Sequence, residues 1–307
     1  MGMVCKKMTT PEQLAGRADG VVRALVERSR SEVRGLFSQG CVKLNGHPCD
    51  DAGEHVDAGD AVEVRYDPQQ RYHERARPWE DDAFSIVFED KHLIVVEKTA
   101  GTLTTAANPG DKNTLVEALM RYFAHRGIRE RVPLVHRLDR DVSGLLVFAK
   151  SRAIAEELQR QFEARKPERQ YAAIVKGVIG ESGDKGTFES YLATTRSHQR
   201  YSTDLAGEGE LAITHFQLEK IVHGASWVRV WLETGRRNQI RVHFAEAGHP
   251  VLGDSRYRPD ISKHPRWRAK RLALHAAVLG FTHPVTGKPL RFQSRLPKAM
   301  RLFLGEH

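Results

Sequence analysis

The residues with the clearest capacity for chemistry lie in one short run, 136–144, which reads His-Arg-Leu-Asp-Arg-Asp-Val-Ser-Gly. Asp139 stands between Arg137 and Arg140, and such guanidinium groups favour the ionised form of a carboxyl group while attracting an anionic substrate. The apolar run 145–149 is typical of a buried strand. Asp139 is therefore predicted to lie on a loop held by a rigid element, as a candidate nucleophile or base. The same run also fits a charged surface loop before a core strand.

The composition bounds the class of protein. The chain has 307 residues, 40% of them hydrophobic, and a formal net charge of +9. That length predicts about two domains at ~150 residues each, and the charge favours polyanionic partners such as nucleic acid or anionic membrane. No stretch approaches the ~20 apolar residues of a membrane span, and the N-terminus lacks the apolar core of a secretory signal. We therefore expect a cytoplasmic protein with no membrane partner.

Metal and disulfide chemistry find little support in the sequence. Cys5, Cys41 and Cys49 form no Cys-x-x-Cys pair, and the odd count argues against a disulfide framework. The 15 histidines include no His-Glu-x-x-His or similar helical spacing. We expect no metal site, no cofactor and reduced thiols.

Residues 1–66 have a pattern of their own, which predicts a small domain. Ser31 is the expected N-cap of its second helix, and Asn45-Gly46 marks a tight hairpin turn. The expected elements are helices around 21–26 and 33–37, and strands over 42–44 and 61–65. Residues 67–82 lack periodicity and contain two prolines, which favours a tether.

Residues 83–307 alternate strands and helices without a repeat. The expected elements are a hairpin of 84–88 with 93–97, a helix over 114–123 capped by Asn113, a helix over 152–164 capped by Ser151, and a strand over 226–232. Because no βαβ period is present, we expect an α+β domain with a long, largely antiparallel sheet.

Four motifs in order resemble those of the RluA-type RNA pseudouridine synthases. They occupy residues 93–101, 136–149, 169–177 and 234–243. Closing segments at 249–254, 272–276 and 283–288 also resemble the family, so that the resemblance covers about residues 84 to 300. Two positions depart from its usual pattern: Thr99 stands where the family has proline, and Asn238 where it commonly has histidine.

This resemblance implies a pseudouridine synthase fold and a set of site residues. Asp139 would be the catalytic carboxylate, Tyr171 the ring that stacks on the flipped uracil, and Arg241 the partner that orients Asp139 and holds it ionised. Arg137 would fill the space that the base vacates. Gln239 and Ile240, in the third of these motifs, are further candidate substrate contacts. The implied reaction detaches a uracil from its ribose and rejoins it through carbon, without redox cofactor or metal.

The first domain resembles the RNA-binding module named for ribosomal protein S-four, with Ser29 to Ser31, Gly40, Asn45-Gly46 and Gly59-Asp60 at matching places. That module is thought to lay its second helix on structured RNA. Arg30, Arg34 and Lys43 are therefore candidate phosphate contacts, because phosphates supply most of the affinity in such binding. Solvated basic faces show the same pattern.

Two other functions stay open. A nucleic-acid N-glycosidase also needs a carboxylate beside a sugar, with a second one to activate water, for which Asp141 is the nearest candidate. A catalytically inactive RNA-binding ribosome-assembly factor would keep the fold alone. We expect large-subunit ribosomal RNA as the substrate, with transfer RNA as an alternative, and a monomeric protein.

The stretch 256–271 mixes cations with Tyr257 and Trp267. Such interleaving suits phosphate contacts with stacking on exposed bases. It also fits a solvated loop whose Trp267 packs against the core.

Overall fold

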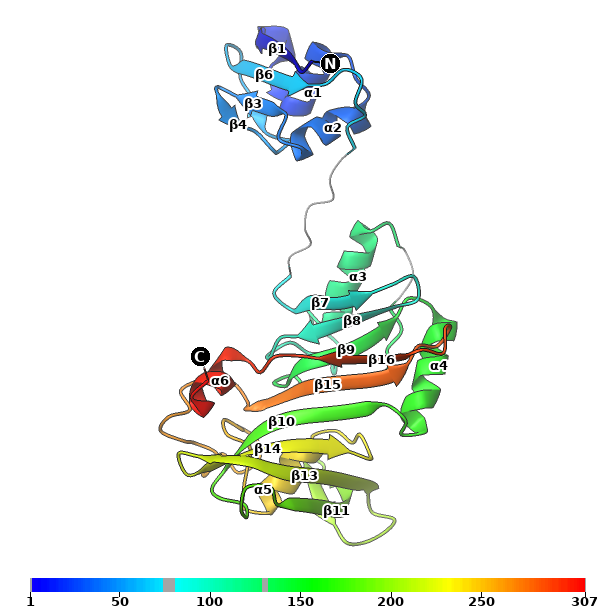
Figure 1. Ribbon diagram of the computed structural model, residues 1–307, viewed down its shortest axis with the longest axis vertical. Coiled ribbons are helices and arrows are strands. Elements are labelled where there is room, and N and C mark those ends of the chain that lie inside the picture. The colour runs from blue at the N-terminus through cyan, green and yellow to red at the C-terminus, as the bar shows by residue number, and fades with distance from the viewer. Residues whose placement is uncertain (1, 74–80, 129–131, 307) are drawn as a thin grey trace. The chain divides into compact units, whose positions relative to one another are not determined.

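The computed structural model describes residues 2–73, 81–128 and 132–306, and the chain divides into two compact units (Figure 1). The units are Met1–Trp79 and Glu80–His307. Residues 74–80, which make up part of the predicted tether, lie outside the described residues. None of the described helices is long and apolar enough to cross a membrane.

The first unit packs two helices on a small antiparallel sheet. Its elements are β1 Val4–Thr9, η1 Glu12–Leu14, β2 Gly16–Arg17, α1 Ala18–Val26, α2 Arg30–Ser38, β3 Val42–Leu44, β4 His47–Pro48, β5 His55–Val56 and β6 Ala61–Tyr66. The sheet has the order β1-β6-β3-β4, and β2 pairs with β5. Asn45 and Gly46 have φ of 49° and 84°, which suits the tight turn between β3 and β4.

Two details of the first unit differ from the sequence-based expectation. Ser29, not Ser31, caps α2, because its side chain accepts a hydrogen bond from the Glu32 N–H. Tyr72 is buried in the core of this unit with Tyr66, so that the described start of the predicted tether packs against the first domain. The domain bounds of 66 and 83 stay a prediction.

The second unit is built on a ten-stranded sheet of order β12-β11-β13-β14-β10-β15-β9-β8-β7, with β16 added beside β15. The strands are β7 Phe84–Glu89, β8 Leu93–Lys98, β9 Ser143–Ala149, β10 Glu168–Lys176, β11 Lys185–Thr194, β12 Arg200–Thr203, β13 Glu210–Val222, β14 Ala225–Leu232, β15 Leu274–Thr282 and β16 Pro289–Gln293. Within the described residues, only the pairing of β9 with β15 is parallel. The expected α+β class with a largely antiparallel sheet is confirmed.

Helices flank this sheet (Figure 1): α3 Leu115–His125, α4 Arg152–Glu163, α5 Gln239–Glu246 and α6 Lys298–Leu304. Thr114, not Asn113, is the N-cap of α3, and forms a capping box with Glu117. Asn113 instead has a φ of 58°. Ser151 occupies the N-cap position of α4 but its side chain makes no capping hydrogen bond.

The start of β9 brings the catalytic candidate into place. Ser143 and Gly144 pair in parallel with His275 and Ala276 of β15. Gly144 has a φ of 121°, and a side chain here would run into the carbonyl of Ala276. A glycine is therefore required at this point, where the chain turns from the Asp139 loop into a fully buried strand.

Candidate active site

A cleft of about 480 Å³ lies over one face of the large sheet. Its walls come from five segments: the loop before β9, the end of α4 with the start of β10, the end of β14 with the turn after it, the start of α5, and Leu274 at the start of β15. The cleft brings together all six residues that the sequence places in the catalytic domain's site, namely Arg137, Asp139, Tyr171, Gln239, Ile240 and Arg241.

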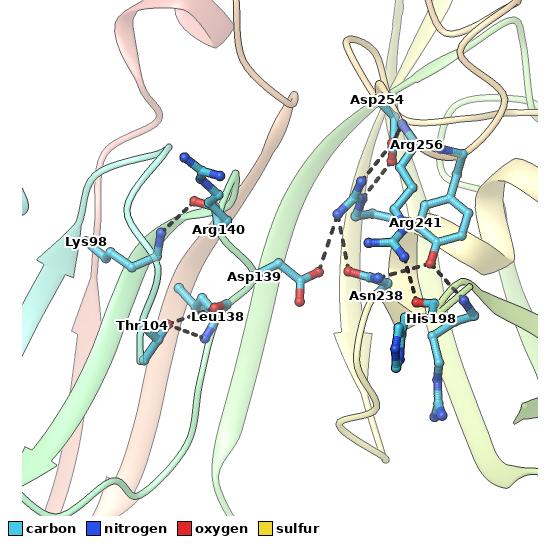
Figure 2. Close-up of polar contacts among 12 residues, drawn as sticks. Lys98, Thr104, Leu138, Asp139, Arg140, His198, Asn238, Arg241, Asp254 and Arg256 are labelled. Carbon is cyan, nitrogen blue, oxygen red and sulfur yellow. Dashed lines mark hydrogen bonds and ion pairs between the residues drawn. The ribbon is translucent and has the colours of Figure 1, made fainter. Parts of the chain in front are cut away.

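The Asp139 loop is held through its main chain (Figure 2). Lys98 is 1% exposed, and its Nζ donates to the carbonyl oxygens of Arg140 (3.0 Å), Thr102 (2.7 Å) and Thr99 (2.9 Å). The hydroxyl of Thr104 donates to the Leu138 carbonyl at 2.8 Å and accepts from the Leu138 N–H at 3.2 Å. Both residues that flank Asp139 are thus fixed by buried groups.

Arg241 lies across the cleft on α5, and its main partner is Asp254. Its Nε and Nη2 donate to the two carboxylate oxygens of Asp254 at 2.7 and 2.8 Å, in the bidentate arrangement that makes such pairs strong. Its Nη1 lies 3.9 Å from Asp139 Oδ2, a longer contact (Figure 2). Arg241 is buried, 6% exposed, and is therefore not a solvent-exposed cation on the helix surface.

Sequence reasoning missed Asp254. The segment 249–254 resembles the family, but neither periodicity nor charge spacing linked its aspartate to Arg241. The only available signal was chemical. An aspartate in a segment with apolar residues and a glycine is expected to need a cationic partner if the segment is buried.

The pKa of Asp139 lies above its usual value, although the neighbouring cations favour the ionised form as the sequence indicates. Burial raises the pKa, and the charges of Arg241 and Arg137 with the N–H of Asn238 and the charge of Lys98 lower it without cancelling the rise. The Asp139 side chain is 19% exposed. The sequence shows the nearby charges, but the loss of water around the carboxyl group depends on the folded structure.

Tyr171 lies on β10 and faces the cleft beside Asp139. Burial and the negative charge of Asp139 raise the pKa of its phenol, against a smaller lowering by Arg169. The side chain is therefore a neutral ring at physiological pH. Tyr171 is thus both a residue of strand β10 and part of the cleft lining.

Asn238 joins the Arg241 cluster. It has a φ of 58°, a conformation that asparagine adopts more readily than most residues. Its Nδ2 donates to the Tyr257 hydroxyl at 3.0 Å, and its Oδ1 accepts from Arg241 Nη1 at 3.2 Å. The Arg241 guanidinium lies 5.1 Å from the centre of the Tyr257 ring. Asparagine at position 238, in place of the family's common histidine, thus supplies an amide that hydrogen-bonds to both Tyr257 and Arg241.

The base-stacking interpretation of Tyr257 and Trp267 is wrong. Tyr257 is 5% and Trp267 8% exposed, and the Trp267 indole N–H donates to the Arg271 carbonyl at 3.0 Å. Both rings pack into the protein, so that the cations of 256–271 are left without exposed aromatic partners from these two positions.

Gln239 is engaged within the protein. Its Oε1 accepts from the Thr234 hydroxyl and the Arg236 N–H, both at 2.9 Å, and its Nε2 donates to the Ile213 carbonyl and the Thr214 hydroxyl, also at 2.9 Å. These four bonds use both ends of the amide. They fix the turn 234–238 that forms one rim of the cleft.

The basic residues of the first unit separate into two places. Arg30 and Arg34 are exposed on α2 and line a groove of about 580 Å³ together with Arg17 and Arg23. Lys43 is exposed on β3 and is not among the residues that line this groove.

Comparison with known proteins agrees with this geometry. Residues 92–246 match the family model described as RNA pseudouridylate synthase, and residues 18–62 match that of the S4 domain. "Ribosomal large subunit pseudouridine synthase D" of Zymomonas mobilis is 35% identical over 98% of this chain and 96% of its own length. The protein of the same name from Nitrosomonas europaea is 33% identical over 97% of this chain and 86% of its own.

The chain belongs to the RNA pseudouridylate synthase family. It is thus an RNA pseudouridine synthase, an intramolecular isomerase with an RNA-binding S4 domain, and the expected family resemblance is confirmed. Among solved structures, "Human RNA Pseudouridylate Synthase Domain Containing 4" matches with a TM-score of 0.57 at 22% identity, covering 72% of this synthase and 92% of the human chain. That likeness shows the shared fold.

Proposed function

We propose that this synthase isomerises uridines of large-subunit ribosomal RNA, with Asp139 as its catalytic carboxylate. The observation that carries the proposal is the convergence of Asp139, Tyr171 and Arg241 on one cleft from three segments far apart in sequence. Two relatives that align over nearly the whole chain are named as large-subunit enzymes, which supports the choice of RNA.

In this proposal the target uridine leaves the RNA stack and enters the cleft, at a cost of a few kcal/mol that protein contacts offset. The Tyr171 ring stacks on the uracil, and exposed Arg137 at the cleft wall fills the space that the base vacates. Burial of the Asp139 carboxyl group removes water that would compete for the sugar and base.

Arg241 has the role of a positioning residue. Because Asp254 and Asn238 fix its guanidinium, the positive charge remains beside Asp139 while the carboxylate attacks or removes a proton. Ile240 and Gln239 shape the wall of the cleft, the latter through its bonds to the turn before α5. Arg30, Arg34 and Lys43 of the S4 domain contact phosphates of the RNA.

A tritium-release assay on ribosomal RNA labelled at carbon 5 of uracil tests the proposal. Asp139→Asn should lower the rate by at least ~10³-fold, the scale expected when a nucleophile or general base is removed. Asp141→Asn is the matched control, because Asp141 is not among the residues lining the cleft and should keep most of the activity. Release by wild type on transfer RNA but not on large-subunit RNA would overturn the choice of substrate.

The same assay separates isomerisation from hydrolysis. An isomerase leaves the RNA mass unchanged, whereas an N-glycosidase frees uracil and leaves a lighter RNA. An Asp139→Asn variant that released tritium at the wild-type rate would show that another group performs the chemistry.

A further inference from the structure

A second groove lies on the face of the large sheet opposite the catalytic cleft. Its volume is about 590 Å³, and its walls come from β10, β13, β14, β15, β16 and the C-terminal segment that includes α6. Gln170 and Ala172 flank Tyr171 along β10, and successive side chains of a strand point to opposite faces. We name this region the rear groove.

The rear groove is rich in guanidinium groups from separate elements: Arg229 on β14, Arg291 on β16, Arg295, and Arg301 on α6. Two carboxylates, Glu219 and Glu306, also line it. The lining therefore has more positive than negative groups. The arginines come from four places in the chain, so their clustering results from the fold and not from one basic stretch of sequence.

Half of these arginines are already neutralised. Arg229 lies 2.6 Å from Glu219, and Arg291 pairs with Glu168 at 2.8 Å. Arg301 uses its Nε on the Leu296 carbonyl at 3.2 Å, and within the described part of the chain Arg295 and Arg301 form no ion pair. Two guanidinium groups thus remain to bind an anion from outside.

The lining also contains an unpaired buried donor. The Trp227 Nε1 has no hydrogen-bond partner among the described residues, although the atom is buried. An unsatisfied buried donor is destabilising, so a ligand that brings an acceptor into the rear groove would relieve that cost. Cations together with an unpaired donor suit phosphate oxygens.

Aromatic rings continue along the same face. Trp231 follows Arg229 at the next outward position of β14, and His215 stacks on it with the ring centres 5.7 Å apart. Trp231 lines an adjoining hollow that shares Gln170 and Arg229 with the rear groove. Alternating cations and aromatic rings on an uncovered surface are typical of sites for single-stranded nucleic acid.

We propose that the rear groove binds the sugar–phosphate backbone of a second segment of the RNA substrate, away from the target uridine. Arg295 and Arg301 bind the phosphates, Trp227 donates to an acceptor of the same segment, and Trp231 offers a ring to a base. This proposal rests on the proposed function only in requiring an RNA longer than the loop that enters the catalytic cleft.

The test compares the full-length wild type with Arg295→Gln/Arg301→Gln on two RNAs: a short hairpin containing the target loop, and a large-subunit fragment of several hundred nucleotides. Binding of the long RNA is measured across salt concentrations. Each lost phosphate contact should lower the slope of log K against log[salt] by about 0.7–0.9, so the double variant should lose about 1.4–1.8. Its KM should rise on the long RNA and stay within twofold of wild type on the hairpin.

Two controls keep the result specific. Arg152→Gln/Arg160→Gln removes the same charge from α4, from residues that line neither the rear groove nor the catalytic cleft, and should give a smaller change in slope. Arg295→Lys/Arg301→Lys keeps the charge and should retain most of the wild-type slope.

An unchanged slope for the double glutamine variant on long RNA would overturn the proposal, as would equal losses on both RNAs. A defect seen only with ribosomal particles and not with naked RNA would also overturn it, because the occupant would then be a protein. Tritium release from the hairpin by every variant separates these results from a failure of the catalytic assignment.

Discussion

The two walls of the catalytic cleft are held by different kinds of contact. On the loop wall, Lys98 and Thr104 bind main-chain atoms of Leu138 and Arg140. On the helix wall, Arg241 is fixed by the side chains of Asp254 and Asn238 (Figure 2). A main-chain contact holds the loop whatever side chain its residues carry, whereas a side-chain pair requires both partners. The helix wall should therefore be the more sensitive to substitution of its own residues.

The largest effect should follow from Asp254→Asn on the helix wall. Asp254 is buried, and the change leaves the Arg241 guanidinium buried without its charged partner. Breaking such a pair costs about 3–5 kcal/mol of unfolding free energy. Tritium release should fall as well, because the positioning of Arg241 is lost. Urea denaturation measures the first effect and the labelled-RNA assay the second.

Asp260→Asn is the control for that change, because Asp260 forms an exposed pair with Arg258 and should matter by less than ~1 kcal/mol. If Asp254→Asn and Asp260→Asn unfolded at the same urea concentration, Arg241 would not depend on Asp254 and the contrast between the walls would fail.

The next effect concerns the loop wall. Thr104→Val keeps the shape of the side chain but removes the hydroxyl that pairs with both main-chain groups of Leu138. We expect a loss of about 1–3 kcal/mol, the cost of unsatisfied buried groups, and a lower kcat because Asp139 is next in the chain. Thr104→Ser should restore both, and Thr105→Val is the neighbouring control. A Thr104→Val variant with wild-type stability would show that Lys98 alone holds the loop.

The pH dependence of the unfolding free energy also compares the two walls, because each has a buried histidine near it. His243 on α5 lies between the hydroxyls of Ser190 and Thr214, and His275 on β15 lies between those of Ser143 and Ser294. Burial lowers the pKa of His243 to about 4; burial, with the charge of Arg271, lowers that of His275 to about 3.

Both folded-state values lie below the ordinary 6.5, so the unfolded chain takes up protons first. Stability should be full above pH 6.5 and should fall as pH decreases, by about 1.4 kcal/mol per pH unit for each histidine. The fall continues to about pH 4 for His243 and about pH 3 for His275. Urea denaturation at pH 7, 6 and 5 measures this pH dependence. His243→Gln and His275→Gln should each reduce it by the contribution of one histidine. Equal pH dependence in wild type and both variants would contradict the assignment.

The smallest effect should come from Leu138→Met. Leu138 is buried, but the contacts that hold the loop at this residue use its main chain. A swap of similar volume should cost less than ~1.5 kcal/mol and should leave tritium release nearly unchanged. A large loss of kcat without a loss of stability would mean that the Leu138 side chain itself sets the position of Asp139.

Much of the arrangement could be predicted from sequence where the cause is local. The loop before β9 follows from a charged run that meets a buried apolar run, and α2, α4 and β14 follow from their apolar spacing. The caps of α2 and α3 were assigned to the wrong neighbours, Ser31 and Asn113, because several residues near each helix start can cap and only the folded backbone decides between them.

By itself, the sequence determined the order of the motifs and the place of Asp139 on a loop before a buried strand. It also determined the largely antiparallel α+β class and the basic surface. Each of these follows from periodicity, turn residues or charge over short stretches of chain. Only the tertiary structure decided that Asp254 holds Arg241, that burial raises the pKa of Asp139, and that Tyr257 and Trp267 are buried. Each of these depends on which distant segments pack together and exclude water, and no local pattern encodes that contact.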